Sequence, residues 1–174
     1  MLSSFPPIAD TGSRLLILGT MPGEQSLRLG QYYGNPRNHF WRLIYTLFSE
    51  QKGNRHGSDD DRRVPHAEYA ERIDFVRRHG VALWDVLASC EREGSLDSRI
   101  RQEQANDFAA FFTAHPLIRH VFFNGAAAEK LFLKHAAPSV SGLPLAFHRL
   151  PSSSPALTAP FEQKLAAWKA IREV

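Results

Sequence analysis

Short, nearly continuous apolar runs alternate along the chain with longer segments of helical periodicity. The clearest runs cover residues 14–19, 81–84 and 120–123, and a weaker run covers residues 145–150. An apolar run of this length without alternating polar residues is typical of a strand that is buried on both faces. The pattern therefore predicts a set of strands that lie inside the molecule.

Amphipathic segments lie between these runs and predict helices. Residues 38–48 place Phe40, Ile44 and Leu47 on one stripe, and Asn38 precedes them in the position of an N-cap. Further helices are predicted over residues 66–78, 107–114, 126–135 and 161–172. Strands that alternate with helices indicate an α/β fold, here a three-layer αβα arrangement around a mostly parallel central sheet of about four strands.

Three of the predicted strands end in segments rich in Gly, Ser, Asn or Pro, at residues 19–38, 124–125 and 151–155. Ligands of open α/β sheets bind beyond the carboxyl ends of the strands, so these segments mark the expected active-site edge. The polar segment 51–63 contains three consecutive aspartates, and we expect a solvated loop there, not a metal site.

Composition narrows the class of protein. A chain of 174 residues suits a single domain, residues 1–174. One cysteine, Cys90, excludes an intramolecular disulfide framework and a four-cysteine metal site. Because the sequence has neither an apolar run of membrane-spanning length nor a signal-peptide pattern, we expect a cytoplasmic protein.

The net charge of +3 does not by itself indicate nucleic acid. Its distribution is uneven, since residues 1–64 carry +2, residues 65–118 carry −3 and residues 119–174 carry +4. If the two basic ends meet, they present a basic face to phosphates. The alternative is a solvated surface with a chance asymmetry.

The densest motif joins a GTMPG loop at residues 19–23 to the segment YYGNPRNHFW at residues 32–41. Glycines at a strand end expose backbone N–H groups and allow another molecule to approach closely. Arg37 and Asn38 lie where the loop becomes a helix, and they bring a guanidinium and an amide to that point. The loop has no GK[ST] ending, so it is not a Walker loop.

These residues resemble the first motif of the uracil-DNA glycosylase superfamily, and most closely its hypoxanthine-DNA glycosylase branch, also called family 6 or DNA-deoxyinosine glycosylase. The mismatch-specific uracil/thymine glycosylases have a related loop, but their catalytic asparagine is replaced here by Met21. The familiar uracil enzymes use an aspartate in this loop, whereas no carboxylate occurs here before Glu24. The resemblance to family 6 implies that Asn38 is the catalytic residue.

The segments 80–90 and 94–98 are similar to the strand and loop that line the base pocket in this superfamily. The resemblance implies that Trp84 forms a wall of the pocket and that Asp85 reads the edge of the base. The alternative is that Trp84 is a core residue and Asp85 a helix cap.

The serine- and proline-rich segment 150–156 resembles the second motif of the superfamily, a loop that enters the minor groove and pinches phosphates. The resemblance implies DNA contacts from Pro151, Ser152, Ser153 and Ser154, with help from Arg37 or Arg149. Taken alone, a serine-rich stretch is more often an ordinary loop. Asn124 and Gly125 are interpreted as a strand-to-helix turn.

The expected function is hydrolysis of the N-glycosidic bond of deaminated bases, hypoxanthine or uracil, in DNA. A glycosylase must extrude its target nucleotide into a pocket. We expect this pocket to be formed by Gly19, Thr20, Met21, Pro22 and Gly23, with Tyr33 or Phe40 stacked on the base. DNA is the expected partner of a monomer, and neither cofactor nor metal is expected, since no HExxH-type pattern occurs. No lysine falls in the matching motifs, so no lyase step is expected.

Three other interpretations remain open. The first is a mismatch-specific G:U or G:T uracil/thymine-DNA glycosylase, which Met21 disfavours. The second is a catalytically silent DNA-binding domain of the same fold, which the missing loop carboxylate favours. The third is a small-molecule hydrolase that uses the same cleft, and the lack of a GxSxG elbow disfavours it.

Overall fold

Four parallel strands form the central sheet of the protein. A computed structural model describes residues 1–49 and 63–174. The strands are β2 (Leu15–Gly19), β3 (Val81–Asp85), β6 (His120–Asn124) and β7 (Ala146–Leu150), in the order β3-β2-β6-β7. Every residue of β2 and β3 is buried, as a strand covered on both faces requires. The predicted parallel sheet is confirmed.

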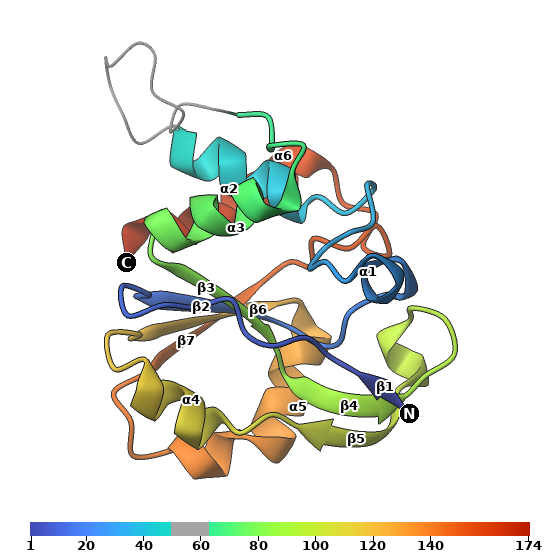
Figure 1. Cartoon of the computed structure of the whole chain (residues 1–174), viewed down its shortest axis with the longest axis vertical. Coiled ribbons are helices and arrows are strands. Elements are labelled where there is room, and N and C mark those ends of the chain that lie inside the picture. Colours follow the sequence, from blue (N-terminus) through green and yellow to red (C-terminus); the bar gives the residue numbers. More distant parts are fainter. Residues whose placement is uncertain (50–62) are drawn as a thin grey trace.

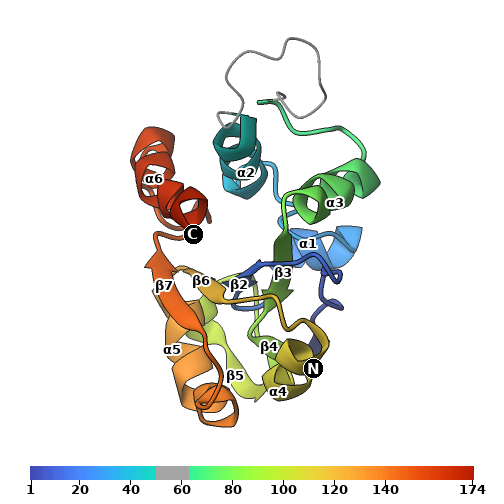
Figure 2. The same ribbon diagram turned by 90° about the vertical axis from the view of Figure 1, so that its left-hand side faces the viewer.

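Helices cover both faces of this sheet, as Figures 1 and 2 show. On one face lie α2 (Phe40–Ser49), α3 (Tyr69–Arg78) and α6 (Phe161–Trp168). On the other lie α4 (Phe108–Ala114) and α5 (Ala126–His135), followed by the 3-10 turn η3 (Ala137–Val140). The predicted αβα layering is therefore confirmed. The last helix is shorter than predicted, because it continues from Trp168 as the 3-10 helix η4 (Lys169–Glu173).

A second, antiparallel sheet was not predicted from the hydrophobic pattern. It consists of β1 (Leu2–Ser3), β4 (Leu87–Glu91) and β5 (Arg101–Ala105), in the order β1-β4-β5, with the 3-10 turn η2 (Asp97–Arg99) before β5. The register of β4 against β5 shifts twice, so neither strand shows the regular apolar–polar alternation of a surface strand. Because of this irregularity, the hydrophobic pattern of the sequence does not predict the second sheet.

The long segment that joins β2 to α2 contains the short helix α1 (Glu24–Leu29), where the sequence indicated only a loop. Gly30 ends α1 in the left-handed conformation, with φ of 65°. Most of the segment 51–63, predicted to be a solvated loop, lies outside the described residues. Within the two described ranges, no helix is both long and apolar enough to cross a membrane.

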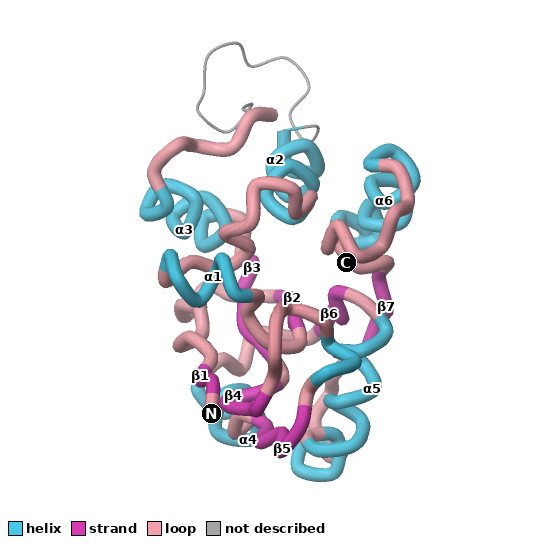
Figure 3. Tube along the Cα trace, turned by 90° about the vertical axis from the view of Figure 1, so that its right-hand side faces the viewer, coloured by secondary structure: helices cyan, strands magenta, loops and turns pink. Residues whose placement is uncertain are grey.

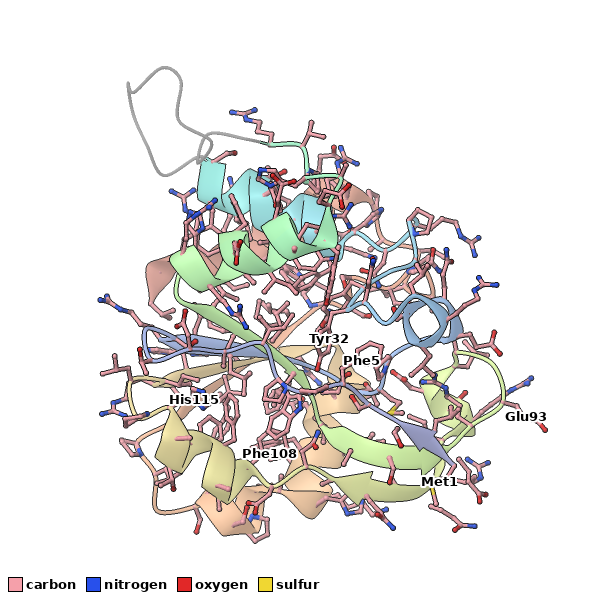
Figure 4. All side chains as sticks on the ribbon, viewed as in Figure 1. Met1, Phe5, Tyr32, Glu93, Phe108 and His115 are labelled. Carbon is pink, nitrogen blue, oxygen red and sulfur yellow. The ribbon has the colours of Figure 1, made fainter. Side chains whose placement is uncertain are left out.

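The N-terminal arm, residues 1–8, extends from the second sheet to β3 of the central sheet and packs against Tyr32 on the way. Figure 4 shows Phe5 beside Tyr32, and their rings meet edge to face with centroids 5.3 Å apart. The Tyr32 hydroxyl donates to the carbonyl oxygens of Phe5 and Pro6 at 3.2 and 3.0 Å. Ile8 pairs with Leu83 of β3. The arm is therefore anchored to the central sheet and not free at the surface.

Candidate active site

A cleft of about 880 Å³ opens at the carboxyl ends of the parallel strands, the edge expected for a ligand in this class of fold. Figure 3 shows the loops that meet there, between α1, α2 and the start of α5. Most residues expected at the site line this cleft: Gly19, Thr20, Met21, Pro22, Gly23, Tyr33, Arg37, Asn38, Asp85, Ser152, Ser153 and Ser154. The structure thus brings together segments that are more than 100 residues apart in sequence.

Asp85 lies at the end of β3 with its carboxyl group against Gly19. A Cβ atom at Gly19 would lie 2.5 Å from Asp85 Oδ1, so only glycine leaves room for this carboxyl group. The Ser4 hydroxyl of the N-terminal arm donates to Asp85 Oδ2 at 3.0 Å. The side chain is only 4% exposed, and burial, with a contribution from nearby Asp97, raises the pKa of Asp85 to about 7. The carboxyl group therefore gains or loses its proton near neutral pH.

Tyr33 and Phe40 form a stacked pair beside the cleft. Their ring centroids are 3.7 Å apart and their planes differ by 14°. Tyr33 adopts a left-handed backbone conformation, with φ of 54°, which is uncommon for an aromatic residue and is found mostly in constrained sites. Phe40 is fully buried and does not line the cleft, so of the two predicted stacking residues only Tyr33 is in position to meet a base.

Asn38 lines the cleft at the turn before α2. Its Oδ1 accepts a hydrogen bond from the Phe40 N–H at 2.9 Å, so the side chain closes a tight turn at the start of the helix. The helix begins at Phe40, two residues later than the sequence pattern predicts. Among the described residues, no group accepts a hydrogen bond from Asn38 Nδ2. The amide therefore has a donor available to the cleft.

The serine-rich loop, Pro151–Pro155, is held by Asn124 at the end of β6. Asn124 Nδ2 donates to Ser153 Oγ at 2.8 Å and to the Tyr33 hydroxyl at 3.3 Å, while Asn124 Oδ1 accepts from the Ser153 N–H at 2.8 Å. Ser153 is fully buried, and its carbonyl accepts from the His39 N–H at 3.0 Å. The Ser153 N–H, carbonyl and hydroxyl oxygen all take part in hydrogen bonds within the protein. Ser152 and Ser154 are partly exposed, so they are more accessible than Ser153 for the predicted phosphate contact.

Asn124 was interpreted from the sequence as part of a strand-to-helix turn, and it does precede α5. The structure adds that its amide joins the loop to the tyrosine of the cleft. Gly125 has φ of 100°, and a Cβ atom there would lie 3.0 Å from the Ser152 Cβ. An Asn-Gly pair at a buried strand end, followed by a helix, was the available signal in the sequence.

Asp97 is a cleft residue to which the sequence pattern assigned no role, although it belongs to the segment 94–98. The Thr20 hydroxyl donates to Asp97 Oδ2 at 3.1 Å, and Ser95 Oγ accepts from the Glu24 N–H at 2.9 Å. Arg92 donates to the Pro22 carbonyl at 2.5 Å. The segment 92–97 therefore braces the 19–23 loop from outside.

Trp84 and Arg149 do not line the cleft, which differs from the expectation for both. Successive side chains of a strand point to opposite faces, so Asp85 at the cleft places Trp84 on the other side. There Trp84 packs against Phe108 and Phe111 of α4, with centroids 5.1 and 4.9 Å away. The Arg149 side chain pairs with Glu129 at 3.3 Å on the outer surface. Pro151, also outside the cleft lining, accepts a hydrogen bond from Trp168.

The cleft offers hydrogen-bond donors, an aromatic face and one carboxyl group that titrates near neutrality. Met21, in the loop that follows β2, has no ionisable group and is 6% exposed. In residues 1–49 and 63–174, no three His, Cys, Asp or Glu side chains gather as they would around a metal ion. The arrangement suits recognition of a planar heterocycle and stabilisation of a departing anion.

A sequence model of the Uracil DNA glycosylase superfamily matches residues 6–173. The chain is similar to the hypoxanthine DNA glycosylase of Methanosarcina acetivorans, with 33% identity over 96% of this chain and 95% of that protein. It is similar to the hypoxanthine DNA glycosylase of Methanosarcina barkeri, with 36% identity over 70% of this chain and 69% of that one.

The fold is similar to the solution NMR structure of a uracil DNA glycosylase candidate from Methanosarcina acetivorans, with a TM-score of 0.74 and 31% identity. That match covers 97% of this chain and 94% of the other. These similarities confirm the resemblance inferred from the GTMPG loop, the PRN element and the serine-rich loop. The chain therefore belongs to the uracil DNA glycosylase superfamily and is a DNA glycosylase homologous to hypoxanthine DNA glycosylases.

Proposed function

We propose that this enzyme removes hypoxanthine from DNA by hydrolysis of the N-glycosidic bond, with no covalent enzyme intermediate. The observation that carries the proposal is a cleft with an unpaired amide donor at Asn38 and a buried carboxyl group at Asp85, but with Met21 in place of a loop carboxylate. Such a site depends on donors to the leaving base and not on a strong general base. Hypoxanthine accepts hydrogen bonds at O6, N3 and N7 and leaves as a stabilised anion.

Binding begins with extrusion of the damaged nucleotide from the helix, which costs least for a mispaired base. The free face of Tyr33 stacks on the extruded base, while Phe40 supports the ring from behind. Aromatic stacking contributes about 1–3 kcal/mol per base in single-strand complexes. The left-handed backbone at Tyr33 places the ring in the cleft before DNA arrives.

As the bond from the base to C1′ of the sugar breaks, negative charge develops on the base and positive charge on the sugar. A water molecule bonds to C1′ and releases a proton, which neutralises the departed base. Asn38 Nδ2 donates to the departing base, since its Oδ1 already holds the start of α2. Protonated Asp85 supplies a second donor, because an ionised carboxylate would repel the anion that forms. Backbone N–H groups of the Gly19–Gly23 loop complete the set of donors around the base.

The phosphates beside the lesion contact the serine-rich loop and the turn before α2. Ser152 and Ser154 supply hydroxyl groups, and the exposed Arg37 supplies a positive charge at the same edge. Ser153 supports the loop through Asn124 and does not itself reach the phosphate. Arg149 lies outside this surface.

The test is single-turnover base release from a duplex with one inosine opposite thymine, beside a duplex with uracil opposite guanine. We expect release from the inosine duplex. Asn38→Asp keeps an oxygen that can accept from the Phe40 N–H but removes the donor, so we expect a rate about 10²–10³-fold lower. Asn38→Ala removes both and also costs about 1 kcal/mol of helix stability.

Each of the other outcomes has a definite meaning. If Asn38→Asp stays as active as the parent chain, Asn38 acts only as a helix cap and the donor role is wrong. Release from the uracil duplex alone would assign the mismatch-specific activity and would make Met21 the residue to explain. Binding to both duplexes without release from either would identify a silent DNA-binding protein.

A further inference from the structure

Lys164 of α6 is a charged residue that none of the steps above uses. Its side chain is fully buried, with a relative exposure of 0%. The ammonium group makes one hydrogen bond, to the Ser154 carbonyl at 3.0 Å. Within the described ranges, no carboxylate pairs with it. A buried ammonium without a counter-charge is unfavourable, and burial accordingly lowers the pKa of Lys164.

The other hydrogen bonds around Lys164 show what α6 does to the serine-rich loop. Trp168 Nε1, one turn later in α6, donates to the Pro151 carbonyl at 2.9 Å, and the His39 N–H donates to the Ser153 carbonyl at 3.0 Å. Three carbonyls of one short loop are thus bonded from the α6 and α2 side. In a trans peptide the N–H points away from the C=O of the same unit. The N–H groups of Ser152 and Ser154 are therefore directed away from the two helices, and there the Ser154 N–H donates to Ser152 Oγ at 3.1 Å.

Two positive charges and one negative charge lie close to His39, beside the serine-rich loop. Arg42 of α2 stacks over the Phe161 ring, with its Cζ atom 3.7 Å from the centroid. Burial, together with the charges of Lys164 and Arg42, lowers the pKa of His39. His39 Nδ1 is itself buried and has no hydrogen-bond partner in the described part of the chain. Glu162, in the first turn of α6, is the nearby acid, and it acts on His39 in the opposite sense.

We propose that the counter-charge of Lys164 is a phosphate of the bound DNA, held on the opposite side of the serine-rich loop. Lys164 is then a positioning residue. Its ammonium group holds the Ser154 carbonyl oriented toward α6, and its positive charge is separated from the phosphate by the backbone of the loop. This inference rests on the proposed DNA substrate but does not depend on which base is removed. It assigns a role to a helix that contains no motif of the superfamily.

The experiment compares Lys164→Met, which keeps the length of the side chain without its charge, with Lys169→Met. Lys169 is exposed just beyond the end of α6, so its replacement removes the same charge from the surface. The probe is a duplex with a tetrahydrofuran abasic analogue, which the enzyme binds but cannot hydrolyse. Affinity is measured from 50 to 300 mM NaCl.

We expect Lys164→Met to bind about ten-fold more weakly at the lowest salt, and the slope of log K against log salt to become shallower by as much as about 0.9. Lys169→Met should match the parent chain in both quantities. A purely structural lysine would lower the melting temperature and leave the salt slope unchanged, and that result would overturn the proposal. If the parent chain binds no duplex at all, the proposed function fails together with this inference.

A second measurement uses the parent chain and does not depend on the folding of a variant. NMR of ¹³C-labelled lysine side chains follows the titration of Lys164 with and without the abasic duplex. A phosphate counter-charge should raise the pH at which Lys164 loses its proton in the complex. An unchanged titration in a complex that forms normally would refute the role, while the base-release assay would still stand.

Discussion

Asp85 is a buried carboxyl group whose affinity for a proton differs between the folded and the unfolded chain. An unfolded chain exposes this carboxyl group to water, where its ordinary pKa is 3.8, whereas burial raises the pKa to about 7 in the folded protein. The folded state therefore binds the proton more tightly than the unfolded state between these two values. The free energy of unfolding therefore decreases as the pH rises from 3.8 to about 7, because the unfolded chain releases this proton more easily than the folded protein does.

We predict that Asp85→Asn stabilises the protein at pH 8 relative to the parent chain. The amide keeps an oxygen for the Ser4 hydroxyl and has no proton to lose. The difference between the two pKa values of Asp85 corresponds to on the order of 4 kcal/mol in the free energy of unfolding. We expect a gap of this size between Asp85→Asn and the parent chain at pH 8, and almost no gap near pH 4. Urea unfolding of both proteins at several pH values measures the gap.

The same pair of proteins reports on the reaction. If protonated Asp85 donates to the leaving base, single-turnover release by the parent chain slows as the pH rises above about 7, and Asp85→Asn removes that dependence. A rate that instead increases through this range would mean that ionised Asp85 accepts a hydrogen bond from the base. A stability gap that does not vary with pH would contradict the buried, titrating carboxyl group itself.

Among the secondary-structure elements, the end of β6 is connected to the serine-rich loop by the hydrogen bonds of Asn124. Asn124 makes three hydrogen bonds there, two to Ser153 and one to Tyr33. The loop also braces itself, since the Ser154 N–H donates to Ser152 Oγ at 3.1 Å. One amide thus sets the position of the serine-rich loop relative to the Tyr33 ring.

We predict that Asn124→Ala lowers the free energy of unfolding by about 2–4 kcal/mol, because it leaves the buried Ser153 N–H and hydroxyl without their partner. Binding of the abasic duplex should weaken as well, because the loop loses its fixed position. Gln163→Ala, at an exposed amide of α6, is the matched control, and a change below about 0.5 kcal/mol is expected there. Equal effects of the two substitutions would show that the hydrogen bonds of Asn124 do not hold the serine-rich loop in place.

At the scale of the whole molecule, both ends of the chain support the site. The N-terminal arm adds β1 to the second sheet, gives Asp85 its hydrogen bond from Ser4 and accepts the Trp84 indole N–H at the Phe5 carbonyl. The C-terminal helix α6 holds the serine-rich loop. Residues from both basic segments of the sequence therefore line one cleft, and the basic side chains in that lining are Arg28 and Arg37.

We predict that removal of residues 1–4 destabilises the protein by roughly 3 kcal/mol, since a strand and the hydrogen bond from Ser4 to Asp85 are lost together. For a chain of this size the melting temperature would fall by roughly 6–12 °C. Ser4→Ala removes the hydrogen bond and keeps the strand, so it should show the smaller part of the effect. An unchanged melting temperature after the deletion would mean that the arm is not part of the folded unit.

The layered α/β fold and the edge of the sheet where the cleft lies could both be predicted from the amino-acid sequence alone. Apolar runs and helical periodicity are local signals, so β2, β3, β6 and β7 and the helices around them could be predicted from them. The motif residues from Gly19 to Asn38 could be placed at the cleft for a related reason, since parallel strands end at the same edge.

Which side chains face the cleft and which support it could not be predicted from local patterns, because this depends on how the elements pack. The second sheet, the core position of Trp84 and the burial of Ser153 and Lys164 depend on contacts between distant segments. Ser4 and Asp85 are 81 residues apart, and Tyr33 and Asn124 are 91 residues apart. Periodicity assigns a residue to a strand or a helix, but the partner of a polar side chain is set by how those elements pack, because burial and hydrogen bonding exist only once the chain has folded.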